Sequence, residues 1–177
     1  MNRALLLDRD GVVNVDHGYV GRREQFDFMP DLFPFLRTAQ DLGYRLAILT
    51  NQAGVARGFY TAADFDDLTQ WMVGELARQG VAVDLVLGCF EHPEGSVAPY
   101  VRDSFWRKPN PGMVLEATQR LRADPARSIF VGDQMRDMEA AAAGGIGHRW
   151  LLGKESAAAD IVAVRDFDHA LKLIRTF

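Results

Sequence analysis

Two aspartates follow the first apolar run of the sequence, and they are the residues best placed to do chemistry. Ala-Leu-Leu-Leu occupies residues 4–7, and Asp8, Asp10 and Gly11 come directly after it. A short apolar run that stops at a polar turn predicts a buried strand of a parallel sheet. Ligands of such sheets bind beyond the carboxyl ends of the strands, which is where Asp8 is expected.

The spacing of Asp8 and Asp10 favours a bound cation. Side chains two positions apart on an extended chain lie on the same side, so both carboxylates can converge. Like charges this close repel unless a positive group lies between them, and Mg²⁺ suits a site of few carboxylates that also serves phosphate. Asp and Gly are also common in turns, so the motif alone could be a strand-end turn.

Thr50 and Asn51 take the same position after the second predicted strand, residues 44–49, that Asp8 takes after the first. Hydroxyl and amide groups at a strand end can hydrogen-bond phosphate oxygens without neutralising nearby carboxylates. A local turn stabilised by these side chains is the alternative. Their place opposite Asp8 favours a role in binding phosphate.

Two adjacent cations, Arg107 and Lys108, close the longest irregular stretch, residues 90–110, just before a helix predicted to begin at Pro111. Arg can bind a phosphate through two hydrogen bonds, and Lys supplies a compact positive charge. A solvated basic pair is the alternative. A loop of this length in a small chain favours function.

Asp133 ends the strand predicted over residues 128–132, and Asp137 follows it. The candidate site therefore combines carboxylates for a metal, donors and cations for phosphate, and a carboxylate that can act as nucleophile. This combination indicates phosphoryl transfer.

Residues 15–28 form a polar segment after the first strand, which predicts a loop or small flap beside the site. Such a segment can contact substrate, although a solvated connection explains the composition equally well. The candidate contacts in it are Asp16, His17, Gly18 and Tyr19.

Composition fits one compact domain spanning residues 1–177, with 48% hydrophobic and 25% charged residues. The net charge of −4 argues against a nucleic-acid or membrane-surface protein, because those partners usually require a basic face. Cys89 is the one cysteine, which excludes an intramolecular disulfide and a Cys-rich zinc site. The first apolar run is too short for a signal peptide or a membrane span, so we expect a cytoplasmic protein.

Strands and helices alternate along the chain. This alternation predicts an α/β fold, a doubly wound Rossmann-like parallel sheet with helices on both faces. Strands are expected at residues 4–7, 44–49, 82–89, 128–132, 148–152 and 160–164. Helices are expected to begin near Pro30, Thr61, Pro111 and Asp166, and residues 138–143 are expected to continue a further helix after Asp137.

Four motifs follow one another in the order D-R-D-G-V, L-T-N, R-K-P and V-G-D-x-x-x-D, beginning at Asp8 and ending at Asp137. In this order, over nearly the whole chain, they resemble the haloacid dehalogenase-like phosphohydrolases. The longer stretches D-R-D-G-V-V-N, T-N-Q-A-G-V-A-R-G and R-K-P-x-P-G-M are similar to the histidinol-phosphatase-like branch, and most similar to its D-glycero-D-manno-heptose 1,7-bisphosphate 7-phosphatases.

The resemblance implies an Mg²⁺-dependent phosphatase that removes the C7 phosphate of a heptose bisphosphate used in lipopolysaccharide precursor synthesis. Asp8 would attack phosphorus and become an aspartyl-phosphate, and Asp10 would protonate the leaving oxygen and then activate water. Asp8, the Asp10 backbone carbonyl and Asp133 would hold the metal, while Thr50 and Lys108 would stabilise the transferring phosphoryl group. Substrate recognition would fall to Arg107 with Lys108, to Asp16, His17, Gly18 and Tyr19, and to Thr50, Asn51, Gln52 and Ala53.

The chain departs from the branch in the loop before R-K-P, where many members bind structural zinc through a C-x-H and a C-x-C pair. The corresponding residues are Cys89, Glu91, Ser104 and Trp106, so we expect no structural zinc. We hypothesise that apolar packing orders the loop instead, through Val97, Tyr100, Phe105 and Trp106. Gln134 is a second departure, because relatives often carry Lys there, and altered substrate affinity is expected.

Three other interpretations remain open. A histidinol-phosphate phosphatase would share the same core and mechanism. A response-regulator receiver also combines acidic residues, Mg²⁺, Thr and Lys, but its phosphoacceptor lies on a middle strand, whereas Asp8 follows the first. A binding protein without activity fits least, because every chemical role is filled. The chain has no room between its motifs for a large cap domain, so we expect an open site, a small phosphosugar substrate, no nucleic-acid or membrane partner, and a monomer.

Overall fold

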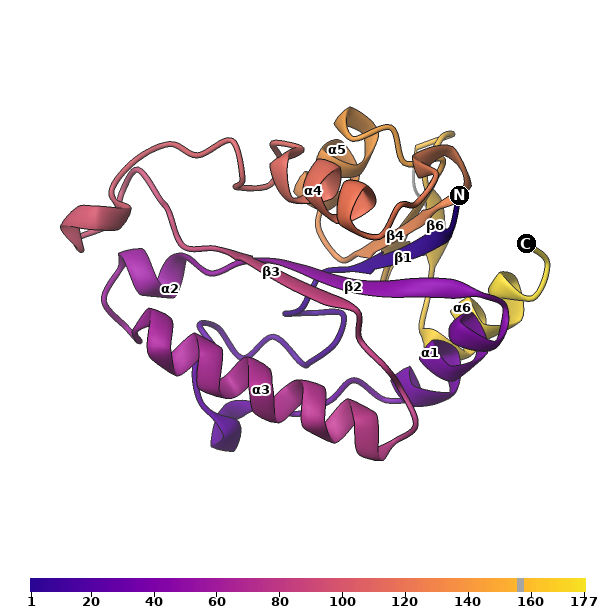
Figure 1. Ribbon diagram of the computed structural model, residues 1–177, viewed down its shortest axis with the longest axis horizontal. Coiled ribbons are helices and arrows are strands. Elements are labelled where there is room, and N and C mark those ends of the chain that lie inside the picture. Colours follow the sequence, from indigo (N-terminus) through magenta and orange to yellow (C-terminus); the bar gives the residue numbers. More distant parts are fainter. Residues whose placement is uncertain (156–157) are drawn as a thin grey trace.

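The computed structural model describes residues 1–155 and 158–177, and one parallel sheet organises them (Figure 1). Its six strands lie in the order β3-β2-β1-β4-β5-β6. They are β1 (Arg3–Leu7), β2 (Tyr44–Asn51), β3 (Leu85–Cys89), β4 (Ile129–Gly132), β5 (His148–Leu152) and β6 (Val162–Val164). The chain builds outward from β1 to β3 and then returns to β4 on the other side of β1. The strand order thus reverses between β1 and β4, the place where open α/β sheets bind ligands.

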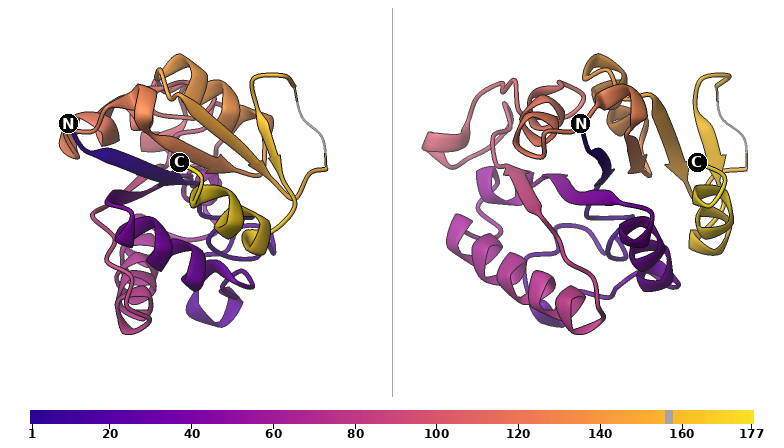
Figure 2. Two further views of the ribbon diagram at one scale, coloured as in Figure 1. Left: turned by 90° about the vertical axis from the view of Figure 1, so that its right-hand side faces the viewer. Right: turned by 45° about the vertical axis from the view of Figure 1, so that its right-hand side comes forward.

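Helices cover both faces of the sheet (Figures 1 and 2). On one face lie α1 (Leu32–Asp41), α3 (Ala62–Arg78) and α6 (Phe167–Ile174), and on the other lie α4 (Gly112–Arg120) and α5 (Met135–Ala143). A single turn, α2 (Ala53–Ala56), follows β2, and short 3₁₀ turns occur at Arg23–Gln25, Ala98–Tyr100 and Pro125–Arg127. This arrangement confirms the predicted doubly wound fold, and the described residues form no separate cap over the sheet.

Alternation along β1 divides the core between the two faces. Leu5 and Leu7 join the apolar cluster beneath α1, α3 and α6, whereas Ala4 and Leu6 join the cluster beneath α4 and α5. All four residues are buried. Burial on both faces fixes the position of the β1 carboxyl end, from which Asp8 extends.

The start of α3 shows how a local sequence signal sets an element. Thr61 caps the helix: its Oγ1 accepts a hydrogen bond from the Asp64 backbone N–H at 3.1 Å, and Asp64 Oδ2 accepts one from the Thr61 N–H at 2.7 Å. This reciprocal pair is a capping box, and it confirms the helix predicted to begin near Thr61. No helix among the described residues is long and apolar enough to cross a membrane.

Several boundaries differ from the sequence-based prediction. β3 begins at Leu85 and not at residue 82, and β6 begins at Val162 and not at residue 160. β2 extends through Thr50 and Asn51, because these residues pair with Gly88 and Cys89 of β3. Residues 53–56 then form α2, where the sequence predicts no helix. Four residues are too few to show helical periodicity, so the sequence carried no signal for this turn.

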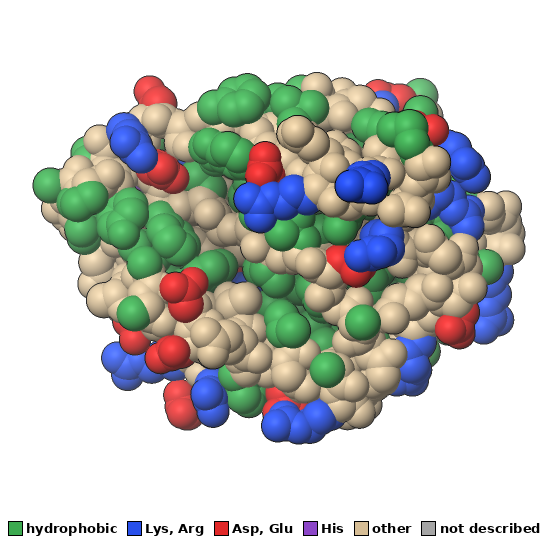
Figure 3. Space-filling view, viewed as in Figure 1, with side chains coloured by type: hydrophobic (Ala, Val, Ile, Leu, Met, Phe, Trp, Pro, Cys, Tyr) green, Lys and Arg blue, Asp and Glu red, His purple; other side chains and the backbone are tan. Residues whose placement is uncertain are grey.

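The hypothesis that apolar packing orders the 90–110 loop is wrong for two of its four residues. Phe105 is 59% exposed and Trp106 is 42% exposed. Figure 3 shows apolar side chains on the surface at the end of the molecule where Figure 1 places this loop. Polar contacts also hold the loop: Glu91 pairs with Arg102 at 2.9 Å and accepts a hydrogen bond from Cys89 Sγ at 3.2 Å.

Candidate active site

Lys108 lies at the centre of the candidate site, with its side chain only 1% exposed. Its ammonium group contacts three oxygens: Asp8 Oδ1 at 2.8 Å, Asp137 Oδ1 at 2.7 Å and the Leu49 carbonyl at 2.8 Å. The ammonium group therefore donates a hydrogen bond to the Leu49 carbonyl and forms ion pairs with both carboxylates. Burial alone would lower the pKa of Lys108, but the two carboxylates raise it above its usual value, so the side chain stays charged.

Asn51 fixes the backbone of Lys108. Its Nδ2 donates to the Lys108 carbonyl at 2.9 Å, and its Oδ1 accepts from the Lys108 N–H at 3.0 Å. The amide group thus ties the end of β2 to the loop that carries Lys108. Asn51 was predicted to contact phosphate; in the structure its amide oxygen and one amide hydrogen are already used to hold Lys108.

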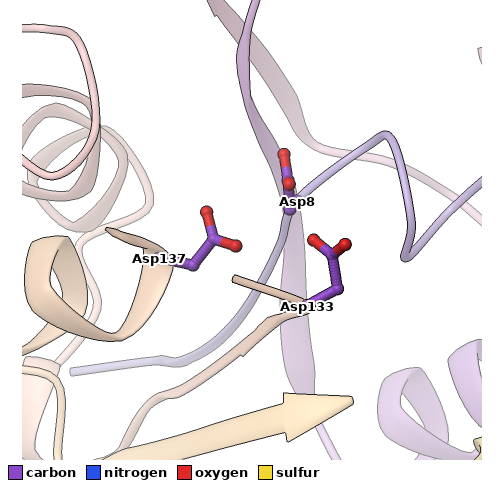
Figure 4. A group of neighbouring side chains, drawn as sticks. All are labelled: Asp8, Asp133 and Asp137. Carbon is purple, nitrogen blue, oxygen red and sulfur yellow. The ribbon is translucent and has the colours of Figure 1, made fainter. Parts of the chain in front are cut away.

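Three carboxylates lie together at the ends of β1 and β4 and at the start of α5, and two of them contact Lys108. Each of Asp8, Asp133 and Asp137 contributes an oxygen that lies within 4.8 Å of the other two (Figure 4). Asp133 follows β4, and Asp137 lies one turn into α5, where its Oδ2 accepts a hydrogen bond from the Gln134 N–H at 3.1 Å. Asp137 was noted beside Asp133 in the sequence but not predicted as a metal ligand, although the D-x-x-x-D spacing places it one helical turn away.

The chemistry of this group fits a divalent cation. With all three carboxylates ionised, the single ammonium group of Lys108 would leave two negative charges without a partner. Asp133 Oδ1 is buried, and no donor within the described residues bonds it. Gly11 makes room for this carboxylate, because a Cβ there would lie 2.4 Å from Asp133 Oδ2. Oxygen ligands in such a cluster are those that Mg²⁺ prefers.

Burial dominates the electrostatics of the two strand-end carboxylates. It raises the pKa of Asp8 to about 7, with Lys108 opposing the shift and Asp137 adding to it. Burial also raises the pKa of Asp133 above its usual value. Both raised pKa values mean that ionising these carboxylates costs free energy in the folded chain. A bound cation would lower that cost.

The carboxylate of Asp10 lies outside this cluster and is held by three side chains. Arg9 Nη2 and Asn14 Nδ2 donate to its Oδ1 at 2.9 and 3.0 Å, and Gln52 Nε2 donates to its Oδ2 at 2.9 Å. The backbone turns at Arg9, whose carbonyl accepts from the N–H groups of residues 12, 13 and 14. The extended alternation that predicted convergence with Asp8 therefore ends before Asp10.

Thr50 lies at the end of β2, 1% exposed, and its Oγ1 accepts a hydrogen bond from Gln52 Nε2 at 2.8 Å. Its hydroxyl hydrogen is free to point toward the site. One side chain thus links Thr50 to Asp10, because the same Gln52 nitrogen donates to both.

A pocket of about 360 Å³ opens in front of Asp10. Eight of the predicted site residues line it, namely Asp10, Asp16, Gly18, Tyr19, Asn51, Gln52, Ala53 and Arg107. Thr50, Lys108 and Asp8 lie deeper. His17 lies apart from the pocket wall: its Nε2 contacts Asp27 Oδ2 at 2.7 Å on an exposed part of the loop.

Three arginines line the pocket: Arg57, Arg107 and Arg136. Nε of Arg57 and Nη1 of Arg107 are buried, and no acceptor in the described part of the chain bonds them. Burial lowers the pKa of Arg107, and the charges of Arg136 and Arg57 lower it further. A buried donor without a partner costs free energy, so these groups are suited to an anionic ligand.

Sequence reasoning missed several pocket residues: Arg57, Tyr60, His92 and Arg136. Arg57 had a signal, because it lies within the T-N-Q-A-G-V-A-R-G stretch. The other three are single residues in loops or in the first turn of α5, and only the tertiary fold brings them together.

Comparison with known proteins agrees with this geometry. The family model of the haloacid dehalogenase-like hydrolases matches residues 2–145. The D-glycero-beta-D-manno-heptose-1,7-bisphosphate 7-phosphatase of Yersinia pestis is 43% identical over 178 residues, which cover 96% of this chain and 95% of the relative. The D-glycero-alpha-D-manno-heptose-1,7-bisphosphate 7-phosphatase of Burkholderia mallei is 44% identical over 151 residues, 85% of this chain and 80% of the relative.

A solved structure extends the likeness to the fold. The D,D-heptose 1,7-bisphosphate phosphatase of B. bronchiseptica, complexed with magnesium and phosphate, superposes with a TM-score of 0.85 at 26% identity, and the match covers 98% of each chain. The extent of these matches, together with the carboxylates at the ends of β1 and β4, shows that the chain belongs to the haloacid dehalogenase-like hydrolases.

Proposed function

We propose that the chain is an Mg²⁺-dependent phosphatase that removes the C7 phosphate of D-glycero-D-manno-heptose 1,7-bisphosphate. The observation that carries the proposal is the set of arginines beside Asp10: Arg57, Arg107 and Arg136 line the same pocket as this residue. A sugar bisphosphate has an anionic group at each end, so one phosphate can meet Asp8 while the other meets the arginines. The names of the relatives from Y. pestis and B. mallei support this substrate.

Asp8 is the nucleophile in this proposal. The Arg9 N–H and Lys108 Nζ both bond its Oδ1 at 2.8 Å, which leaves Oδ2 available for attack. Oδ2 forms a bond to phosphorus as the bond from phosphorus to the leaving oxygen breaks. Positive charge from Lys108 orients the carboxylate and stabilises the charge that develops during the transfer.

Asp10 moves the protons. In its protonated form it gives a proton to the leaving sugar oxygen while Asp8 becomes an aspartyl-phosphate. The resulting Asp10 carboxylate then takes a proton from water, whose oxygen attacks phosphorus. The bond between phosphorus and Asp8 breaks, inorganic phosphate leaves, and both aspartates return to their starting forms.

Asp8 and Asp133 would hold Mg²⁺, with the Asp10 backbone carbonyl as a further ligand and Asp137 adding charge behind them. A cation held by these groups would supply positive charge that offsets the repulsion between the anionic nucleophile and the anionic phosphate. The unpartnered buried oxygen of Asp133 and the charge imbalance around Lys108 support this assignment.

Asp133→Asn is expected to weaken Mg²⁺ binding at least about tenfold, because one of the ligand carboxylates loses its charge. Mg²⁺ should raise the thermal unfolding temperature of the wild type, and the variant should need a correspondingly higher Mg²⁺ concentration for the same rise. Asp31→Asn is the matched control, because Asp31 is exposed at the start of α1. An unchanged Mg²⁺ dependence in Asp133→Asn would contradict the metal assignment.

A histidinol-phosphate phosphatase would use the same carboxylates. Its substrate, however, carries an ammonium group and an imidazole ring in place of a second phosphate, and these groups would meet Arg57, Arg107 and Arg136. Like charges in a partly buried pocket repel. The pocket therefore favours the bisphosphate.

The test measures Mg²⁺-dependent phosphate release from the α and β anomers of heptose 1,7-bisphosphate and from histidinol phosphate, side by side. We expect kcat/KM for one heptose anomer to exceed that for histidinol phosphate at least about a hundredfold, which corresponds to roughly 3 kcal/mol in transition-state binding. The product should retain the phosphate at C1. Higher kcat/KM for histidinol phosphate would overturn the substrate assignment and leave the mechanism in place.

A further inference from the structure

The ring of Tyr60 lies in a slot between Gly21 and Gly54, where a side chain on either glycine would collide with it. A Cβ on Gly21 would lie 2.5 Å from Tyr60 Cδ1, and a Cβ on Gly54 would lie 2.3 Å from Tyr60 Cε1. Gly21 belongs to the loop after β1, and Gly54 belongs to α2. The slot fixes the direction of the ring, and the hydroxyl at its tip reaches Gln52 Oε1.

Gln52 is buried, 2% exposed, and its amide is used at both ends. Its Oε1 accepts from the Tyr60 hydroxyl, while its Nε2 donates to Asp10 Oδ2 at 2.9 Å and to Thr50 Oγ1 at 2.8 Å. Turned by half a rotation, the amide would place its oxygen against the Asp10 carboxylate, where two acceptors repel. The Tyr60 hydroxyl stabilises the opposite orientation, because it supplies the donor that Oε1 needs. Burial raises the pKa of Tyr60 to about 12, so the hydroxyl keeps its hydrogen.

The geometry points to Tyr60 as a positioning residue that acts through Gln52 on Asp10. This inference rests on the proposed function, in which Asp10 is the general acid and base. Arg9 and Asn14 donate to Asp10 Oδ1, and Gln52 donates to one lone pair of Oδ2. The remaining lone pair of Oδ2 is then the place for the transferred proton, and the Gln52 amide sets its direction.

Chemistry gives this role a distinctive signature. A sugar or simple alkyl alkoxide is a strong base and a poor leaving group, so aspartyl-phosphate formation from an alkyl phosphate needs a proton from Asp10. p-Nitrophenolate is a weak base and leaves without one. A misdirected Asp10 should therefore lower kcat/KM for the alkyl phosphate and spare p-nitrophenyl phosphate, because kcat/KM covers the steps up to that first bond cleavage.

Tyr60→Phe tests the inference, because it fills the glycine slot and removes only the hydroxyl. We expect kcat/KM for heptose bisphosphate to fall about tenfold, and that for p-nitrophenyl phosphate to change less than about twofold. Tyr44→Phe is the matched control: Tyr44 is 4% exposed at the start of β2, and its hydroxyl lies 3.4 Å from Arg3 Nη1. This control should leave both values of kcat/KM unchanged.

The same comparison of two substrates distinguishes an effect of Tyr60→Phe on Asp10 from an effect on Thr50. Thr50 serves the phosphoryl group, which both substrates share, so a loss transmitted through Thr50 would lower both values of kcat/KM equally. Equal losses in Tyr60→Phe, or no loss at all, would overturn the role assigned to Tyr60.

Gln52→Leu provides the second test. If Tyr60 acts through Gln52, adding Tyr60→Phe to Gln52→Leu should cause almost no further loss, since the linking amide is already gone. A further tenfold loss would overturn the inference.

A wild type that hydrolyses propyl phosphate and p-nitrophenyl phosphate but not heptose bisphosphate would refute the substrate assignment alone. The Tyr60 comparison would then use propyl phosphate as its alkyl substrate. A wild type that releases phosphate from none of the three would refute the phosphatase function, and the role of Tyr60 with it.

Discussion

Replacement of Asp8 by Asn is expected to lower phosphate release by about 10⁴-fold or more, because an amide cannot form the acyl-phosphate bond. Asn matches Asp in shape, and its amide oxygen can still accept the hydrogen bonds that the Arg9 N–H and Lys108 donate to Oδ1. Loss of activity therefore reports the chemistry of the carboxylate and not its packing. The measurement is single-turnover phosphate release by the purified variant.

The same substitution should leave the stability of the metal-free protein unchanged or raise it. Asp8 and Asp137 share Lys108, and burial raises the pKa of Asp8 to about 7, so its charge is costly in the folded state. Asn removes that charge, so the denaturant midpoint should not fall. Asp66→Asn, on the exposed side of α3, is the control for both measurements. Asp8→Asn that retains more than about 1% of wild-type release would contradict the assignment of the nucleophile.

The fold could be predicted from local patterns because each signal lies within a few residues. The apolar run 4–7 is buried on both faces of the sheet, which is why it contains no polar position. Thr61 and Asp64 begin α3 through a capping box that four residues specify. Strand ends are not set by local patterns. Thr50 and Asn51 belong to β2 because they pair with β3, a contact between segments far apart in the sequence.

Part of the candidate site could be predicted for the same reason. Parallel strands bring their carboxyl ends to one edge of the sheet, so Asp8 after β1 and Asp133 after β4 had to lie near each other. That rule does not predict the path of the chain beyond the strand. The chain turns at Arg9, so the Asp10 carboxylate bonds Gln52 and Asn14 and lies outside the carboxylate cluster.

The positions of the other residues near the site depend on contacts that no local sequence pattern encodes. His17 was expected at the pocket and pairs with Asp27 instead, because a loop with two turns can point a side chain either way. Tyr60 follows α2 and reaches the site only because Gly21 and Gly54 leave space for its ring. Such residues are visible once loops from different strands are placed together.

Lys108→Met is expected to damage both stability and activity. Met keeps much of the apolar volume of the Lys side chain, but it leaves Asp8 and Asp137 buried without the cation that lies 2.8 and 2.7 Å from them. Removing one partner of a buried ion pair costs about 3–5 kcal/mol. Activity should fall about 10³-fold, because the nucleophile loses its orientation and the transferring group loses a positive charge. Equilibrium denaturation and phosphate release measure the two effects.

Replacing an exposed lysine should have a much smaller effect on stability and activity than replacing buried Lys108. Lys172 pairs with Asp168 on the surface of α6, with its side chain 71% exposed, so Lys172→Met should change neither stability nor activity appreciably. Lys108→Met with wild-type stability would contradict the view that Lys108 neutralises buried carboxylates.

A second substitution separates the two roles of Lys108. In Lys108→Met/Asp137→Asn, one of the unpaired carboxylates is gone, so stability should recover in part while activity stays low. Mg²⁺ should also stabilise Lys108→Met more than it stabilises the wild type, because the cation would neutralise carboxylates that Lys108 no longer serves. Recovery of stability without activity would show that charge balance holds this site together, whereas phosphoryl transfer needs the ammonium group itself at the carboxylate of Asp8.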